Sequence, residues 1–373
     1  MTDPPPPAAL APEAPPEPVE HPPAPFEGLP TGPGSVIVGT FDLLTRASVD
    51  IRRGSFYIGL IVLGTVAPVV LLAWGLQVAT AGRSDQETLT VAQGPIGAWL
   101  GGASLLAVAG ALVAIVESRG LAVALLGARL EGRPLQVRDA VQRSRMVFWH
   151  VVAATLLISG PLTVIQYALA AWLATVFHGV SEVTTFSAAI VAATLGTPFA
   201  YVAAGIVLGD VGAIEATRRS LRLFAVRRRS ALVVSLFAFA AQLLTGIGLG
   251  SGLDLVLRVF EALGLGPASG DVGVAITSAL IVIIVFAFGT LLFTVTAIAA
   301  APQVLMFLAL THATPGLAKV RALATGPQGS IRAGWGSGPP PIRWRFRWLT
   351  RPMLLAIVIG ALVAAGGLAS LNR

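Results

Sequence analysis

The chain has 373 residues, of which 55% are hydrophobic and only 12% charged, with a net charge of +7 and a mean hydropathy of +0.81. One water-soluble core cannot bury so many apolar side chains, so the composition favours a membrane protein. The absence of cysteine from the sequence excludes disulfide scaffolds, thiolate metal sites and cysteine nucleophiles.

The four histidines show neither an HExxH motif nor another metal-ligand spacing. We therefore expect no metal and no cofactor. The basic residues lie between apolar segments, where the positive-inside rule explains them, and they form no basic soluble face with interleaved aromatic side chains. The sequence thus indicates no nucleic-acid partner.

Residues 1–34 hold half of the 26 prolines and five acidic residues, but no lysine or arginine. Such a segment cannot build a core, and we predict a disordered cytoplasmic tail. It lacks the basic start and the apolar region of a signal peptide. The first span is therefore expected to direct insertion.

Apolar and charged residues separate onto different helical faces between Val36 and Arg53. The apolar face carries Val38, Phe41, Leu44 and Ile51, and the charged face carries Asp42, Arg46, Asp50 and Arg53. This pattern predicts an amphipathic helix. It can lie at the inner membrane interface or dock on the bundle, since both give the same pattern.

Seven apolar stretches are long enough to cross about 30 Å of hydrocarbon as helices. The first six form a membrane domain at 35–312, a Gly/Pro-rich basic linker follows at 313–349, and 350–373 holds the last helix. We expect the sixth stretch to be one helix that tilts, protrudes or kinks at Gly289 or Pro302. The predicted spans are Phe56–Val78, Ile96–Val116, Phe148–Phe177, Phe186–Leu208, Ala231–Gly250, one within Val272–Leu310, and Met353–Leu371.

The basic residues alternate from one inter-span segment to the next. All but Arg83, Arg258 and Arg373 of the 25 fall on alternate loops. By the positive-inside rule the N-terminus is cytoplasmic and the C-terminus is outside. We predict an all-α polytopic bundle of about seven transmembrane helices in a bacterial cytoplasmic (inner) membrane.

Two cytoplasmic segments are alike: Val137–Arg145 and Ala213–Arg222 each read as a short amphipathic helix that leads into a span. This hints at duplicated helix pairs.

Three further stretches carry a family resemblance. They are the run Gly132–Ala140 continuing into Phe148-Trp149, the run Gly212–Leu223 with Arg227 to Arg229, and Phe41–Arg53. Over 36–312 the chain resembles the six-span membrane domain of glycerophosphoryl diester phosphodiesterases and related stand-alone bacterial membrane proteins of unknown function. The family's activity belongs to a separate soluble barrel with catalytic Glu, Asp and His residues and a metal. Those residues have no counterparts here, so the resemblance implies a membrane domain without phosphodiesterase activity.

We find no catalytic constellation, although Asp210 with Glu215 comes closest, and expect no enzyme. The leading hypothesis is a protein that organises or senses lipids or partner proteins at the cytoplasmic leaflet. The alternative is a transporter or permease component for a small solute. Candidate contacts to anionic lipid are Arg143, Arg145, Arg218, Arg219, Arg222, Arg227, Arg228, Arg229, Arg343, Arg345 and Arg347.

The motif of Gly97 and Gly101 in the second span permits close approach of another helix. We expect that helix to belong to the same chain. A homo-oligomer or another membrane-protein partner is the alternative.

Overall fold

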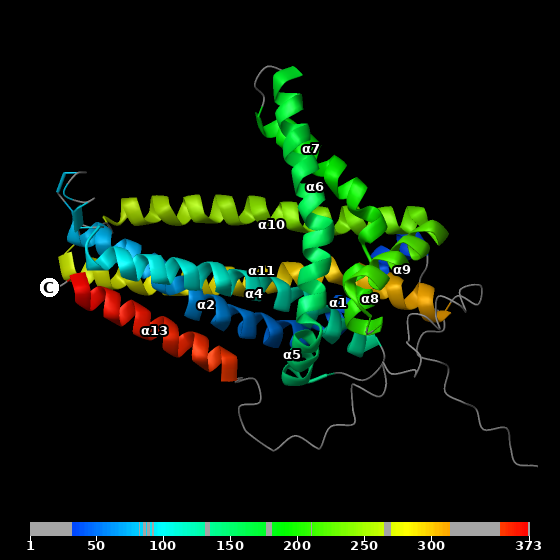
Figure 1. The fold of residues 1–373 in the computed structure, drawn as a ribbon, viewed down its shortest axis with the longest axis horizontal. Helices are drawn as coiled ribbons and strands as arrows, with labels where there is room; N and C mark the ends of the chain where they lie inside the picture. The colour runs from blue at the N-terminus through cyan, green and yellow to red at the C-terminus, as the bar shows by residue number, and fades with distance from the viewer. Residues whose placement is uncertain are drawn as a thin grey trace, which may run out of the picture.

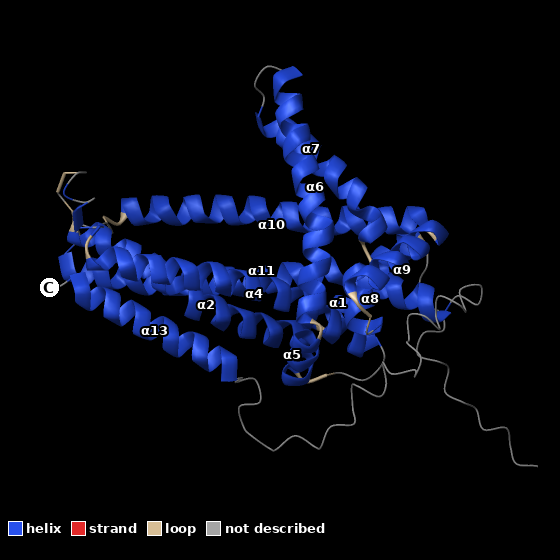
Figure 2. Ribbon diagram, viewed as in Figure 1, coloured by secondary structure: helices blue, strands red, loops and turns tan. Residues whose placement is uncertain are grey.

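The computed structural model describes residues 32–81, 83–84, 87, 90–91, 93–130, 135–176, 181–209, 211–264, 270–313 and 351–371. In these ranges the regular structure is helical, with no strand (Figure 2), and seven helical segments are long and apolar enough to cross a membrane. The predicted all-α polytopic class is confirmed. The predictions for the acidic tail and the basic linker fall almost entirely outside the described residues.

Long apolar helices form most of the structure. They are α2 (Ser48–Ala79), α4 (Pro95–Leu130), α6 (Phe148–Val176), α10 (Arg228–Ala262), α11 (Gly270–Leu308) and α13 (Arg351–Leu371). The shorter helices are α1 (Pro33–Arg46), α5 (Val137–Met146), α7 (Ser181–Gly196), α8 (Val202–Gly209) and α9 (Ala213–Val226). A 3₁₀ segment, η1 (Thr197–Phe199), lies between α7 and α8, and a π-helical turn, η2 (Ala309–Ala313), follows α11.

The centre of the bundle is α2, which packs against α4, α11 and α13. These helices run side by side with α10, and their directions alternate along the chain (Figure 1). As a result α2 and α10 begin at the end of the bundle where α1 and α9 lie, and α4 and α11 end there. The C-terminus lies at the opposite end. We call the end with α1, α5 and α9 the basic end.

Glycines let α13 approach α2 closely. A Cβ atom on Gly64 would lie 2.7 Å from the carbonyl carbon of Ala356, and one on Gly360 would collide with the carbonyl oxygen of Gly64. Small residues are typical of such contacts between membrane helices. Gly101 does not make the expected contact, because a Cβ there would meet no other atom within 4 Å, and the expectation for Gly97 stays a prediction. The homo-oligomer alternative stays a prediction.

Three amphipathic helices lead into spanning helices through joints of one residue. Ala47 joins α1 to α2, Val147 joins α5 to α6, and Arg227 joins α9 to α10. The helices α5 and α9 contain the two similar segments found in the sequence. The same order of short helix, joint and long helix thus occurs three times in the described chain.

The predicted amphipathic helix over 36–53 is too long. The helix α1 ends at Arg46, and residues from Ser48 onward belong to the first spanning helix. Asp50 was placed on a charged outer face, but only 6% of it is exposed. Its carboxylate faces inward because Arg129 of α4 binds it there, with N–O distances of 2.6 and 3.2 Å.

The fourth predicted span, Phe186–Leu208, is not one continuous helix. It breaks at η1, where Pro198 has no backbone N–H to donate to a helical carbonyl. The hydroxyl of Ser220 on α9 bridges the break: it donates to the Pro198 carbonyl at 2.7 Å and accepts from the Tyr201 N–H at 3.2 Å. The helix α6 crosses the direction of the other long helices, and the part of it that packs on α7 projects from the bundle (Figure 1).

Several of the described helices are much longer than the hydrocarbon of a membrane is thick, among them α2 with 32 residues, α10 with 35 and α11 with 39. The second predicted span ends at Val116, whereas α4 continues to Leu130. With 36 residues at about 1.5 Å each, α4 is roughly 54 Å long, against about 30 Å of hydrocarbon. The sixth span is a single helix, as expected, because α11 runs uninterrupted through Gly289 and Pro302.

Substitution of Gly360 by alanine tests the close contact of α13 with α2. The new methyl group meets backbone that cannot move cheaply, so we expect a loss of about 1–3 kcal/mol and a lower apparent Tm in detergent. Gly101→Ala is the matched control and should leave Tm unchanged or slightly raised, because alanine favours helix. Equal Tm values for the two variants would argue against this contact.

Single cysteines introduced into the cysteine-free chain test the sidedness. Thr90 and Ala225 are exposed near opposite ends of the bundle. The positive-inside rule puts Ala225 in the cytoplasm. In intact cells an impermeant maleimide should label Thr90→Cys and leave Ala225→Cys unlabelled until the cells are opened. Labelling of both, or the reverse pattern, would require a different topology.

Candidate functional site at the basic end

The predicted lipid-contacting arginines divide into three groups. Arg143, Arg145 and Arg219 bind groups of the protein itself. Arg343, Arg345 and Arg347 lie outside the described residues. The others have exposed side chains on α9 and at the start of α10, and we call them the arginine strip: Arg218, Arg222, Arg227, Arg228 and Arg229.

A buried carboxylate connects three helices beneath α5. Glu117 of α4, 4% exposed, accepts a hydrogen bond from the Tyr57 hydroxyl of α2 at 2.9 Å. Its other oxygen accepts from Arg145 of α5, also at 2.9 Å, and Arg145 donates to the Tyr57 oxygen at 2.9 Å as well. Each of the three side chains thus binds the other two, and the arrangement holds α5 against α2 and α4.

The charge of Arg145 is secured by this arrangement. Burial lowers its pKa, but attraction to Glu117 and Tyr57 outweighs burial, and the net pKa is raised. Arg143, two residues earlier, donates two hydrogen bonds to the Val207 carbonyl near the end of α8, at 3.0 and 2.8 Å. A cation at a helix C-terminus also interacts favourably with the helix dipole. Both guanidinium groups thus bind the protein, and their contact with lipid stays a prediction.

Arg219 likewise binds a group of the protein and does not extend from the surface. It is 6% exposed and forms an ion pair with Glu215, one turn earlier on α9, at 3.1 Å. Among the described residues its Nη1 atom has no hydrogen-bond partner. Asp210, proposed to act with Glu215, lies outside the described residues.

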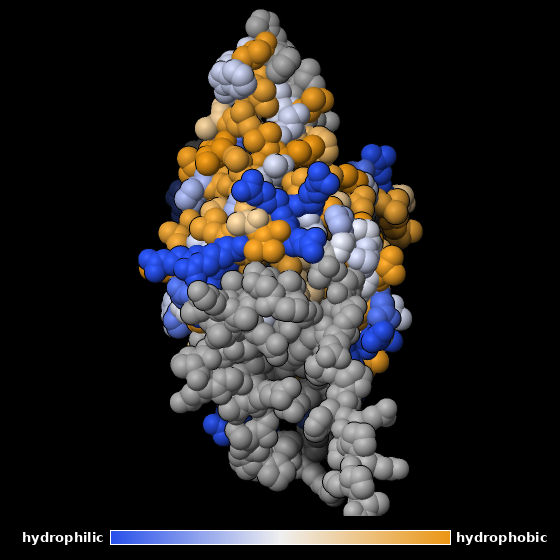
Figure 3. Space-filling model, turned by 90° about the vertical axis from the view of Figure 1, so that its right-hand side faces the viewer, coloured by the Kyte–Doolittle hydropathy of each residue, from blue (hydrophilic) through white to orange (hydrophobic). Residues whose placement is uncertain are grey.

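Of the predicted lipid contacts, the arginines of the strip are the ones with exposed side chains among the described residues. The guanidinium of Arg228 lies 6.0 Å from the centre of the Phe224 ring, a distance typical of a cation–π contact. Figure 3 looks onto this end of the molecule, where hydrophilic residues lie among hydrophobic ones. A surface that mixes guanidinium and apolar groups is suited to a membrane's headgroup region.

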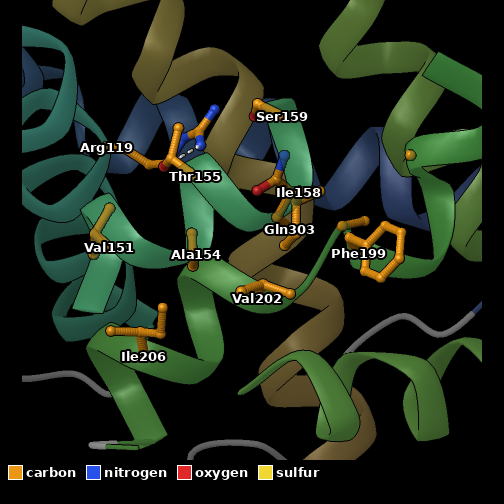
Figure 4. A pocket seen from close by; sticks show the side chains of 13 residues that line it. Arg119, Val151, Ala154, Thr155, Ile158, Ser159, Phe199, Val202, Ile206 and Gln303 are labelled. Carbon is orange, nitrogen blue, oxygen red and sulfur yellow. Dashed lines mark hydrogen bonds between the residues drawn. The ribbon is translucent and has the colours of Figure 1, made fainter. Parts of the chain in front are cut away.

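Behind this surface lies a cavity of about 140 Å³ that is partly open to the exterior. It is bounded by α4, α6, η1, α8 and α11 (Figure 4). Most of the lining residues are apolar, but polar groups form nearly as much of the exposed wall as apolar groups do. The polar residues that line it are Arg119, Thr155, Ser159 and Gln303.

Arg119 points into this cavity. Its Nη1 donates to the Thr155 hydroxyl at 3.4 Å, drawn as the dashed line in Figure 4. Within the described chain Arg119 has no carboxylate partner, and the side chains of Ser159 and Gln303 have no hydrogen-bond partner. An unpaired guanidinium beside free hydroxyl and amide groups is chemically suited to bind an oxyanion.

Comparisons with protein-family models, curated proteins and solved structures found no match. The family resemblance described above thus stays a prediction. The described residues contain no group of three or more His, Cys, Asp or Glu side chains that could hold a metal ion. The geometry of the basic end is therefore the evidence for its role.

Sequence reasoning missed the Tyr57–Glu117–Arg145 arrangement and the Arg119 cavity. It placed Glu117 and Arg119 just beyond the second span, counted Arg119 only as positive-inside charge, and assigned Arg145 to anionic lipid. A weak signal was available, because Glu117 is an acidic residue directly after a long apolar run. Its partners, however, come from helices far away in the sequence.

Glu117→Ala should lower the stability by about 2 kcal/mol, measured as apparent Tm in detergent. This is below the ~3–5 kcal/mol of a fully buried pair, because Arg145 is partly exposed and can reach water. Tyr57→Phe, which removes one hydroxyl, should cost about 1 kcal/mol. The double variant Glu117→Ala/Arg145→Ala should lose less than the sum of the single variants. Strict additivity would contradict the coupling.

Proposed function

We propose that this chain is a non-enzymatic, multi-pass protein of a bacterial cytoplasmic membrane that holds anionic lipid at its basic end. The observation that carries the proposal is the arginine strip, five exposed guanidinium groups around the α9–α10 joint. Near an anionic leaflet each such charge contributes about 1 kcal/mol of attraction. Salt weakens this attraction because it screens exposed charges.

The position of the strip supports this role. It lies where α9 leads into the candidate spanning helix α10, so a bilayer crossed by α10 would bring the strip close to its headgroups. The resemblance to stand-alone six-span membrane domains is consistent with a protein that acts on membrane organisation and carries no catalytic barrel. The positive-inside rule assigns this end to the cytoplasm.

The transporter alternative stays a prediction without a specific observation in its favour. A cavity of about 140 Å³ is smaller than the ~300–1,000 Å³ of most small-molecule sites. It also lies at the basic end, whereas the sites of typical secondary transporters lie near the bilayer midplane.

Neutralisation of the arginine strip tests the proposal. The variant carries Gln at 218, 222, 227, 228 and 229. We expect the wild type, purified from mixed phosphatidylglycerol and phosphatidylcholine membranes, to retain excess phosphatidylglycerol, and the variant to lose most of that excess. Lipid analysis of the purified protein provides the measurement, with the wild-type excess falling as NaCl is raised.

The control variant is Arg83→Gln, which removes an exposed arginine from the opposite end. It should leave the retained lipid unchanged. If wild type and strip variant retain the same ratio of anionic to neutral lipid, the proposed function is wrong.

A further inference from the structure

The cavity at Arg119 differs from the arginine strip in both position and chemistry. It lies inside the helical structure and presents one unpaired guanidinium, two hydroxyls and an amide, with apolar walls that include Val151, Ile206 and Phe199 (Figure 4). The strip is an open surface that many lipids can occupy at once. The cavity can hold only one small group.

Arg119 lies at the depth of lipid headgroups. The helix α4 begins at Pro95, after a polar connection at the opposite end, and a rise of about 1.5 Å per residue puts Arg119 roughly 36 Å farther along its axis. Because the hydrocarbon is about 30 Å thick, a perpendicular α4 carries Arg119 to the phosphate level of the other leaflet. A partly open cavity at this depth is within reach of lipid headgroups.

The neighbouring carboxylates do not neutralise Arg119. Glu117 accepts from Tyr57 and Arg145, Asp50 is bound by Arg129, and Glu215 pairs with Arg219. A half-buried guanidinium with only a 3.4 Å bond to a hydroxyl retains most of its donors for a ligand. Leaving such donors unpaired costs free energy, and a bound anion would recover it.

The size and the walls of the cavity select the ligand. A volume of about 140 Å³ accommodates a phosphate group with a few attached atoms, and an entire phospholipid does not fit. The wall combines these polar groups with apolar side chains, which suits a phosphate that continues into hydrocarbon. An ammonium headgroup finds no carboxylate in the lining, so net anionic headgroups should bind better than zwitterionic ones.

We infer that this cavity is a lipid-binding site that takes the phosphate of one anionic phospholipid headgroup, with Arg119 as its counter-ion and Thr155, Ser159 and Gln303 as hydrogen-bonding partners. The inference rests on the proposed function in that both place anionic lipid at the basic end. It concerns different side chains, however, so the two can fail separately.

Native mass spectrometry of the full-length protein in detergent tests the site by counting retained lipids. We expect the wild type to keep one phosphatidylglycerol molecule that resists mild washing. In Arg119→Gln its occupancy at limiting lipid should fall roughly tenfold, as expected for the loss of a charge-assisted contact. Ala203→Leu, which fills the cavity and keeps the charge, should cause a similar loss.

Two controls separate the site from the strip and from general damage. Arg222→Gln changes an exposed arginine of the strip and should keep the single retained lipid. Apparent Tm without added lipid shows whether Arg119→Gln and Ala203→Leu still fold. If Ala203→Leu is unstable, Thr155→Val, which loses only the hydroxyl partner, replaces it and should weaken retention.

Binding of three different ligands shows whether the anion comes from a lipid or from free phosphate. Phosphatidylglycerol should occupy the site, phosphatidylcholine should not, and inorganic phosphate alone should neither bind nor displace the lipid. Equal retention in wild type and Arg119→Gln, or retention lost only in the strip variant, would overturn the inference. Displacement by inorganic phosphate would overturn its lipid part and leave a site for free oxyanions.

Discussion

A charged group that enters a bundle surrounded by lipid must be paired, and the basic end is organised by this requirement. Glu117 and Asp50 are carboxylates on helices that also span the apolar region, and each is neutralised by an arginine from another helix. Because those arginines come from α5 and α4, pairing the charges also fixes the contacts between helices. The same ion pairs therefore neutralise the buried charges and fix the positions of the helices.

The same requirement applies to backbone groups. The helix is interrupted between α7 and α8, so some backbone groups there lack the hydrogen bonds of a continuous helix. The Ser220 hydroxyl supplies both a donor and an acceptor to these groups. The guanidinium of Arg143 likewise binds a carbonyl near the end of α8. Arg119 is the exception, because the described chain offers it only a hydroxyl. Unlike Arg129, Arg145 and Arg219, it has no carboxylate partner among the described residues.

Much of the architecture follows from sequence, because length and apolar composition determine spanning helices almost directly. The long apolar runs at Phe148 and Met353 gave nearly the observed bounds of α6 and of the last helix. Sequence reasoning failed where tertiary contacts decide. Nothing local reveals that Asp50 turns inward, that α4 continues past Val116, or that Arg143 and Arg145 bind groups of the protein. Periodicity shows which face a residue occupies, but not what that face meets.

The joints at Ala47, Val147 and Arg227 have a mechanical consequence. A joint of one residue contains no slack, so the short helix before it and the long helix after it cannot reorient independently. A bilayer that thickens or thins changes the tilt of a spanning helix at modest cost. Through these joints, a change in tilt would also rotate α1, α5 or α9. The thickness of the membrane and the geometry of the basic end would thereby be coupled within the chain.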